Sequence, residues 1–144
     1  MRVLGLDLGS ARIGVAVSDR SGTIASPLTV LQRSGSPARD HYAIARLVVE
    51  EEAEAVIVGL PLNMNGSLGP AAKAAVAEAR ALATVVGVPV HTSDERRTTV
   101  TADRAMMEAG MKAPARRKVV DKIAAAVLLQ HWLDGQAARR SGQQ

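Results

Sequence analysis

Three acidic positions of the chain stand where a carboxylate needs an explanation. Asp7 lies in the middle of an apolar run, Asp94 and Glu95 directly follow another, and Asp121 lies within the apolar pattern VVDKIAAAVLL. A carboxylate in a buried strand is costly unless it is paired or holds a metal ion. Glycines on either side of Asp7 leave room for a ligand to approach. These acids are therefore the candidate catalytic or metal-binding residues.

Each acid also has a purely structural explanation. Asp7 could pair with Arg12, and Asp121 could pair with Arg117, although a base four residues before an acid is the weaker order on a helix. The two acids after the apolar stretch 88–92 could serve a first helical turn, as a cap or through the helix dipole. On local grounds the structural and the functional interpretation of these two acids are equally supported.

Acids from a first strand, a late strand end and a final helix together favour a site for a hard cation. Mg²⁺ and Mn²⁺ prefer oxygen ligands. Two such ions about 4 Å apart can activate a water and stabilise a leaving oxygen in phosphodiester cleavage. Several basic residues near these acids would hold a nucleic-acid backbone: Arg96, Arg97, Arg116, Arg117, Lys118 and Lys122.

The charge distribution agrees with a phosphate-rich partner. The formal net charge is +4, and all of this excess lies in residues 91–144, since residues 1–90 carry eight basic and eight acidic side chains. Such a segment favours nucleic acid, with a solvated basic face as the alternative. The aromatic residues are only Tyr42 and Trp132, which predicts against recognition of single strands by base stacking.

Other function classes are excluded or disfavoured by composition. The chain has no cysteine, which excludes a disulfide framework, thiolate zinc, an iron–sulfur cluster and a cysteine nucleophile. No apolar stretch approaches the roughly 18 residues of a membrane span, and the N-terminus lacks a signal-peptide pattern. We therefore expect a cytoplasmic protein with no membrane partner.

The first third of the chain predicts three consecutive strands. Residues 3–9, 12–19 and 23–31 are β-like runs joined by short turns, which is typical of an antiparallel meander. Pro27 predicts that part of the third strand is an edge or a bulge, because proline cannot donate to a strand ladder.

The rest of the chain alternates between helices and strands. Ser36 and Pro37 predict a helix start, and Ser93 with Asp94 offers a second helix cap. The order βββ-α-β-α-β-α-α predicts an α/β fold with a mixed sheet covered on both faces. After the first helix, the expected elements are strands 55–62 and 88–92 and helices 71–86, 98–109 and 116–133. We expect one domain over 1–134 and a flexible polar tail over 135–144.

Four segments carry a resemblance to a known family. DLGSARIGVAVSD (7–19), GLPLNMNGSLG (59–69), DERRTT (94–99) and VDKIAAAVLLQHWLD (120–134) resemble the YqgF-type pre-16S ribosomal RNA nucleases. That family belongs to the ribonuclease H-like superfamily and is related to Holliday-junction resolvases. The resemblance covers nearly the whole chain and stops before the tail.

The resemblance implies a ribonuclease H-like five-stranded mixed sheet, a cytoplasmic location and hydrolysis of nucleic acid with a divalent metal, Mg²⁺ or Mn²⁺. It places the catalytic and metal-binding roles on Asp7, Glu95 and Asp121. The wider superfamily has an acid where Pro61 ends its strand here, so Glu95 would substitute for it. The expected substrate-binding residues, from the resembling loop and the basic residues, are Asn63, Asn65, Gly66, Ser67, Arg96, Arg117 and Lys118.

The function expected from the resemblance is processing of the 5′ end of pre-16S ribosomal RNA during ribosome biogenesis. One alternative is resolution of branched DNA, a Holliday junction, in recombination and repair. Further alternatives are a fragment of an actin-like ATPase, which holds phosphates with a hairpin like Asp7 to Gly9, and a non-catalytic nucleic-acid-binding protein. The protein would act as a monomer or a homodimer.

Overall fold

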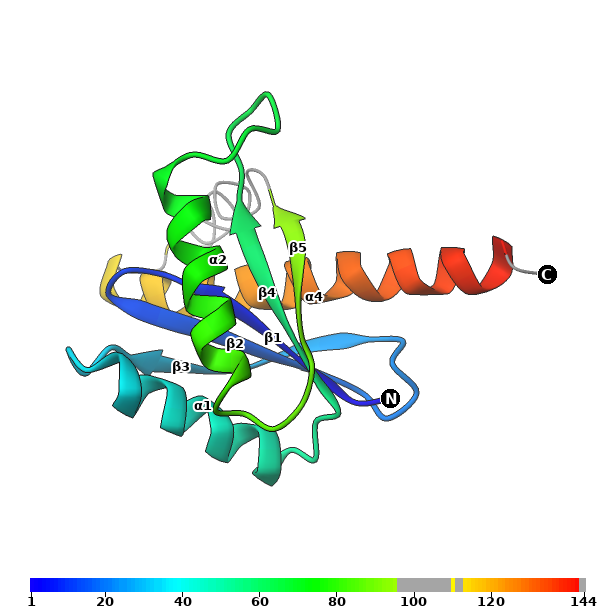
Figure 1. Ribbon diagram of the computed structural model, residues 1–144, viewed down its shortest axis with the longest axis horizontal. Coiled ribbons are helices and arrows are strands. Elements are labelled where there is room, and N and C mark those ends of the chain that lie inside the picture. Colours follow the sequence, from blue (N-terminus) through cyan, green and yellow to red (C-terminus); the bar gives the residue numbers. More distant parts are fainter. Residues whose placement is uncertain (96–109, 111–112, 143–144) are drawn as a thin grey trace.

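The computed structural model describes residues 1–95, 110 and 113–142, without the side chains of Glu95, Ala113 and Pro114. The predicted helix 98–109 lies outside this description. The described elements, labelled as in Figure 1, are β1 (Val3–Leu8), β2 (Arg12–Ser18), β3 (Ala25–Gln32), α1 (Pro37–Glu50), β4 (Ala55–Pro61), α2 (Pro70–Ala83), β5 (Val90–Glu95) and α4 (Ala113–Gly142). The five strands form one sheet in the order β3-β2-β1-β4-β5.

The N-terminal half of the sheet is the predicted meander. β1 pairs antiparallel with β2, and β2 pairs antiparallel with β3. β3 is an edge strand, and its register shifts between Val15 and Ala16 of β2, next to Pro27. The prediction of an edge and a bulge at this proline is confirmed.

The C-terminal half of the sheet is parallel. β1 pairs with β4 and β4 pairs with β5 in the same direction. The carboxyl ends of β1, β4 and β5 therefore lie at one edge of the sheet, which we call the carboxyl edge. In open α/β sheets this is the edge outside which ligands bind.

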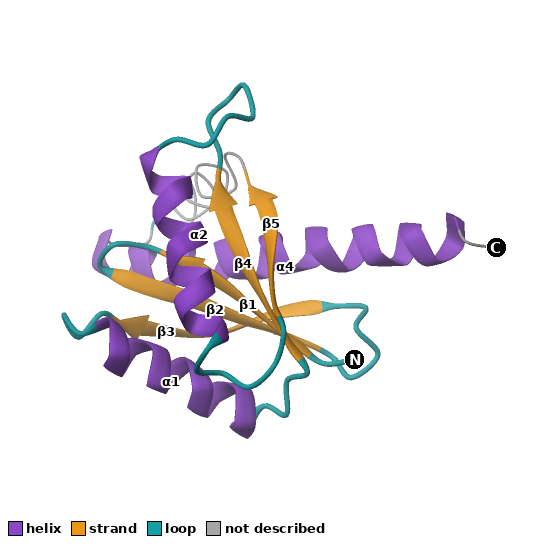
Figure 2. Ribbon diagram, in the orientation of Figure 1, coloured by secondary structure: helices purple, strands orange, loops and turns teal. Residues whose placement is uncertain are grey.

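Helices cover both faces of the sheet (Figures 1 and 2). α1 and α2 pack on the face of Leu4 and Leu6, whereas α4 packs on the face of Val3 and Ile57. Alternation along β1 predicts this division, since successive side chains of a strand point to opposite faces. Asp7 has the same alternation as Val3 and therefore belongs to the α4 face.

The ends of two helices test the sequence-based boundaries. Ser36 caps α1 by accepting a hydrogen bond from the Arg39 backbone N–H, with Pro37 at the helix start, as predicted. α4, in contrast, continues to Gly142, well beyond the predicted end at residue 133. Its last buried residue is Leu133, so its final turns extend past the core. Independent movement of residues 135–144 stays a prediction.

No helix among the described residues combines the length and the apolar character needed to span a bilayer.

Candidate active site

Two of the three predicted acids lie beside each other because of one glycine. Asp7 in β1 is directly opposite Gly14 in β2. A Cβ atom added to Gly14 would lie 2.0 Å from the backbone oxygen of Asp121, so α4 rests directly on the sheet at this point. Residues directly opposite in an antiparallel pair point to the same face. The half-buried Asp7 side chain therefore neighbours Asp121 on α4.

α4 also approaches the sheet closely one turn and two turns after Asp121, at Ala125 and Leu129. At Gly5, an added Cβ would lie 2.8 Å from Leu129 Cβ and 3.2 Å from the Ala125 backbone oxygen. Glycines at positions 5 and 14 thus let the helix backbone settle onto the sheet without an intervening side chain. This packing fixes the depth at which Asp121 is presented to Asp7.

Arg12 is the cation at this point. Its Nε donates to Oδ2 of Asp121 at 2.6 Å, and both side chains are largely buried, with 24% and 19% exposed. From the sequence alone, Arg12 is the expected structural partner of Asp7, and Arg117 is that of Asp121. The observed pair joins the first hairpin to the last helix, 109 residues later. Charge-assisted bonds of this kind are short and strong.

The turn that follows Asp7 is held from both sides. The Gly9 N–H donates to the Asp7 carbonyl at 3.1 Å, and Arg33 Nε donates to the Gly9 carbonyl at 3.0 Å. A Cβ on Gly9 would lie 2.6 Å from the Arg12 carbonyl, so only glycine fits this close turn. The hairpin that carries Asp7 is therefore rigidly connected to its surroundings.

Arg33 extends this connection to both helices on the opposite face. Its guanidinium binds Glu78 of α2 through two bonds of 2.7 and 2.9 Å, and Glu78 also contacts His41 of α1 at 2.8 Å. The Arg33 bonds, followed by the His41 bond, hold the pKa of Glu78 below its ordinary value. Ser34 likewise lowers the pKa of Asp40, which it contacts through its hydroxyl and its N–H. Sequence analysis missed this network, because its members lie in four separate segments.

Glu95 ends β5, opposite Pro61 of β4. Its backbone therefore lies at the carboxyl edge, the same edge as the end of β1. The side chain lies outside the described residues, as does all of Arg96. The predicted helix cap at Ser93 and Asp94 is wrong, because both residues belong to β5 and pair with β4. The strand continues through the polar residues because its backbone bonds to β4 outweigh their preference for a cap.

The loop 63–69 follows β4 at the carboxyl edge and extends beyond the sheet (Figure 1). Its polar side chains bond one another: Asn63 Nδ2 donates to Ser67 Oγ at 3.0 Å, and Asn65 Oδ1 accepts from the Ser67 hydroxyl at 2.6 Å. Gly66 has a φ of 84°, which favours glycine. These four predicted substrate-binding residues thus first of all shape the loop.

The predicted basic contacts differ in how they are placed. Arg117 and Lys118 are exposed on the first turns of α4, ahead of Asp121 on the same helix. They face solvent, where a phosphate backbone could reach them. Arg116 is half-buried.

The described residues contain no group of three or more His, Asp or Glu side chains arranged to hold a metal ion. They do place Asp7 opposite Gly14, against which the backbone of Asp121 packs, with a guanidinium bound to one carboxylate oxygen of Asp121. Carboxylate oxygens are the donors that Mg²⁺ and Mn²⁺ prefer, and Arg12 competes with such an ion only for Oδ2 of Asp121. The described donor set therefore fits a divalent ion.

Comparison with known proteins identifies the family. A family profile described as RuvX, a Holliday junction resolvase, matches residues 1–135. The chain belongs to this family. A relative from Moorella thermoacetica named "Putative pre-16S rRNA nuclease" is 49% identical over 134 residues, covering 93% of this chain and 95% of the relative. A Mycobacterium sp. (strain KMS) relative with the same name is 45% identical over 138 residues, covering 95% and 82%.

Solved structures support the fold of this RuvX-family chain. Thermus thermophilus RuvC in complex with a Holliday junction substrate has a TM-score of 0.57 and 22% identity, covering 95% of this chain and 96% of the other. The yeast mitochondrial Holliday junction resolvase Ydc2 has a TM-score of 0.50 and 11% identity, covering 94% and 80%. The predicted family and the ribonuclease H-like mixed sheet are both confirmed.

Proposed function

We propose that this protein is a divalent-metal-dependent nuclease whose catalytic and metal-binding residues are Asp7, Glu95 and Asp121. The observation that carries the proposal is the contact between Gly14, the cross-strand partner of Asp7, and the backbone of Asp121. This contact supports the proposal, because Asp7 and Asp121 are 114 positions apart in the chain and both adjoin Gly14. The end of β5, where Glu95 lies, is at the same edge of the sheet.

The three acids would hold Mg²⁺ or Mn²⁺, as one ion or as a pair. When bound, the divalent ion supplies charge neutralisation for the phosphodiester and activation of a water. Asp7 stands on the rigid hairpin and fixes one side of the site. Asp121, which Arg12 holds through Oδ2, would supply a carboxylate oxygen to the ion. Arg12 would add positive charge where a phosphate would bind.

The remaining residues position the substrate strand. Arg117 and Lys118 are exposed near Asp121 and would bind backbone phosphates, with Arg96 following Glu95 in the chain. The loop formed by Asn63, Asn65, Gly66 and Ser67 would contact the strand at the carboxyl edge. Because its side chains already bond one another, it offers a preformed surface rather than separate polar tips.

The favoured substrate is precursor ribosomal RNA, with processing of the 5′ end of pre-16S rRNA in the cytoplasm during ribosome biogenesis. The names of the relatives that are 45–49% identical support this choice. The second candidate substrate is branched DNA, supported by the description of the matching family. A monomer suffices for RNA processing, whereas resolution of a junction requires two symmetric cuts and hence a homodimer.

Cleavage of labelled precursor RNA and of a four-way DNA junction, side by side, tests the proposal. We expect cleavage of the RNA with Mg²⁺ or Mn²⁺, none with a chelator, and a loss of at least about 10³-fold in Asp7→Asn with substrate binding retained. Asn keeps the size of Asp7 and removes only its charge. Full activity of Asp7→Asn would refute the mechanism. Cleavage of the four-way junction without cleavage of the RNA would make branched DNA the substrate in place of precursor ribosomal RNA.

A further inference from the structure

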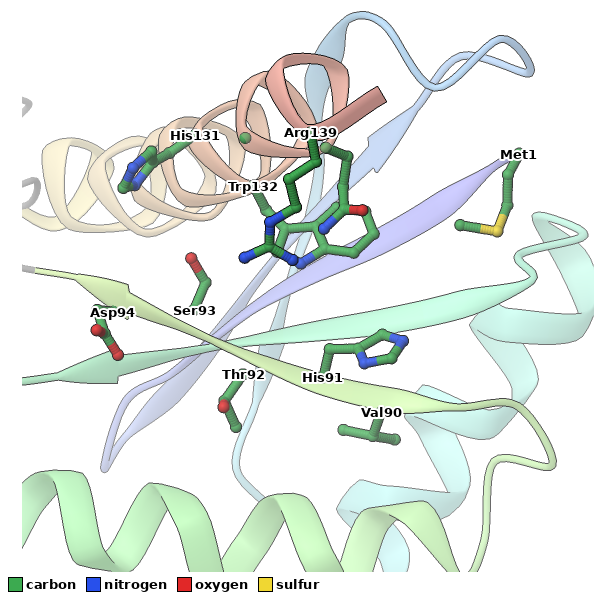
Figure 3. A pocket seen from close by; sticks show the side chains of 11 residues that line it. Met1, Val90, His91, Thr92, Ser93, Asp94, His131, Trp132 and Arg139 are labelled. Carbon is green, nitrogen blue, oxygen red and sulfur yellow. The ribbon is translucent and has the colours of Figure 1, made fainter. Parts of the chain in front are cut away.

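A groove lies on the α4 side of the sheet, between β5 and the C-terminal half of α4. It encloses about 830 Å³, within the range of ligand sites. Its floor is β5 from Val90 to Asp94, and its wall includes His131, Trp132, Gln136 and Arg139. Figure 3 shows His91 and Ser93 of β5 on the side of Trp132 and Arg139, whereas the side chains of Val90, Thr92 and Asp94 point to the opposite face of the sheet. The Asp94 end of the groove adjoins Glu95 and thus the candidate active site.

The groove contains the one tryptophan of the chain, which is only partly buried there. The His91 ring stacks on the Trp132 indole, with centroids 5.9 Å apart and an interplanar angle of 21°. Two flat rings that face an open groove offer a surface on which a further planar group can stack. Trp132 packs partly against the core on the α4 side, whereas His91 is exposed, so the ring of His91 is available to a ligand in the groove.

Arg139 supplies positive charge at the far end of the groove. It is exposed, and no acid among the described residues forms an ion pair with it. It lies on the turns of α4 that follow the last buried residue, Leu133, so the core does not require its position. Asp94 stands at the end next to the candidate active site, and its side chain points away from α4 (Figure 3).

We propose that this groove binds an unpaired segment of the nucleic-acid substrate next to the cleavage site, with a base stacked at Trp132 and His91 and a phosphate at Arg139. The proposal rests on the proposed nuclease function. The strand from Val90 to Asp94 is about 13 Å long, at about 3.3 Å per residue, and matches about four stacked nucleotides at 3.4 Å each. The low aromatic content predicted against base stacking, but the structure places the single tryptophan where one base can use it.

The single tryptophan makes the groove directly observable. Emission of the full chain is titrated with single-stranded octauridylate, octathymidylate and a blunt duplex, all in chelator so that no cleavage occurs. We expect saturable quenching by the single strands and none by the duplex at equal concentration. Quenching by both sugars indicates stacking without sugar readout, and tighter binding of the RNA adds a contact to the 2′-hydroxyl; either supports the groove.

Variants separate the groove from general charge effects. Arg139→Gln should weaken single-strand binding and lower the slope of log affinity against log salt by about one. Arg80→Gln, which removes the same charge from α2 on the opposite face, should change neither. Trp132→Leu, followed by anisotropy of a labelled oligonucleotide, should weaken binding about 5- to 100-fold, and His91→Ala should weaken it less.

The proposal would be overturned by binding seen by anisotropy with unchanged Trp132 emission, by no binding at all, or by equal effects of Arg139→Gln and Arg80→Gln. A change of Trp132 emission on concentrating the protein alone would assign the groove to a second copy and also overturn it. The nuclease proposal fails separately. If single strands quench Trp132 but no substrate is cleaved with Mg²⁺ or Mn²⁺, the groove stands and the catalytic assignment falls.

Discussion

Gly14→Ala is the substitution that most directly tests how the active site is assembled. The added methyl group would lie 2.0 Å from the Asp121 backbone oxygen and 2.6 Å from its carbonyl carbon. Both atoms are backbone, so no side-chain rotation relieves the clash. The helix must move away from the sheet, and Asp121 must move with it.

The size of the effect follows from this overlap. An ordinary contact requires a carbon–oxygen separation of about 3.4 Å, so α4 must shift by more than about 1 Å near Asp121. Overpacking of this kind costs about 1–3 kcal/mol of stability. A displacement of about 1 Å at a catalytic group costs about 10²-fold in rate. We therefore expect both losses together, with nucleic-acid binding by the exposed basic residues largely kept.

Urea unfolding measures the first loss, and single-turnover cleavage under conditions where the variant is fully folded measures the second. Gly142→Ala is the matched control, since an added Cβ there meets nothing within 4 Å. It should change the free energy of unfolding by less than about 0.5 kcal/mol and leave cleavage unchanged. Wild-type stability and rate in Gly14→Ala would refute the assigned contact between β2 and α4.

Three further predictions concern the charged residues. Arg12→Gln should lower the melting temperature measured in chelator by differential scanning calorimetry, because a charge-assisted bond in a partly buried place contributes about 1–3 kcal/mol. The same variant should gain more stability than wild type when Mg²⁺ is added. Glu78→Gln should be less stable than wild type at pH 7. Folding lowers the pKa of Glu78, so the contribution of its carboxylate to stability is present above the ordinary pKa of 4.5 and is lost as the pH falls through the pKa of the folded protein. The free energies of unfolding of the two proteins should therefore converge in acid. Parallel curves would contradict this assignment. Arg117→Ala should weaken binding of RNA and reduce the salt slope by about one in filter-binding assays, and an unchanged slope would exclude a phosphate contact.

The sequence was sufficient for the architecture because the relevant patterns are local. Alternation in β1 separates Leu4 and Leu6 from Val3 and Asp7, and turn residues set the meander. Pro27 predicts the edge strand, because proline has no backbone N–H to donate to a neighbouring strand. The end of β5 was placed too early, because Ser93 and Asp94 have turn-like propensities, and the ladder to β4 overrides these. The end of α4 was also placed too early, since a polar composition does not prevent a helix from continuing.

The candidate site could be predicted only in part. Asp7 can be identified because burial of a carboxylate in an apolar strand costs free energy. Asp121 can be identified because it lies within an apolar helix. Their partners could not be predicted, because an ion pair between Arg12 and Asp121 depends on packing between distant elements. Gly14 carried a signal that could have been used: a glycine opposite a candidate acid indicates that another element approaches there. The connection from Arg33 to Glu78 had no such signal.

The packing of α4 on the meander has a consequence for biosynthesis. The helix covers strands that end at Gln32, yet it begins at Ala113, about 80 residues later. At about 5–20 residues per second, about 4–16 s pass between the synthesis of these strands and of α4, and during that time β1 and β2 have no partner on that face. A nascent chain therefore cannot complete the packing of α4 on β1 and β2, or the proposed catalytic site that depends on it, until translation has passed Asp121.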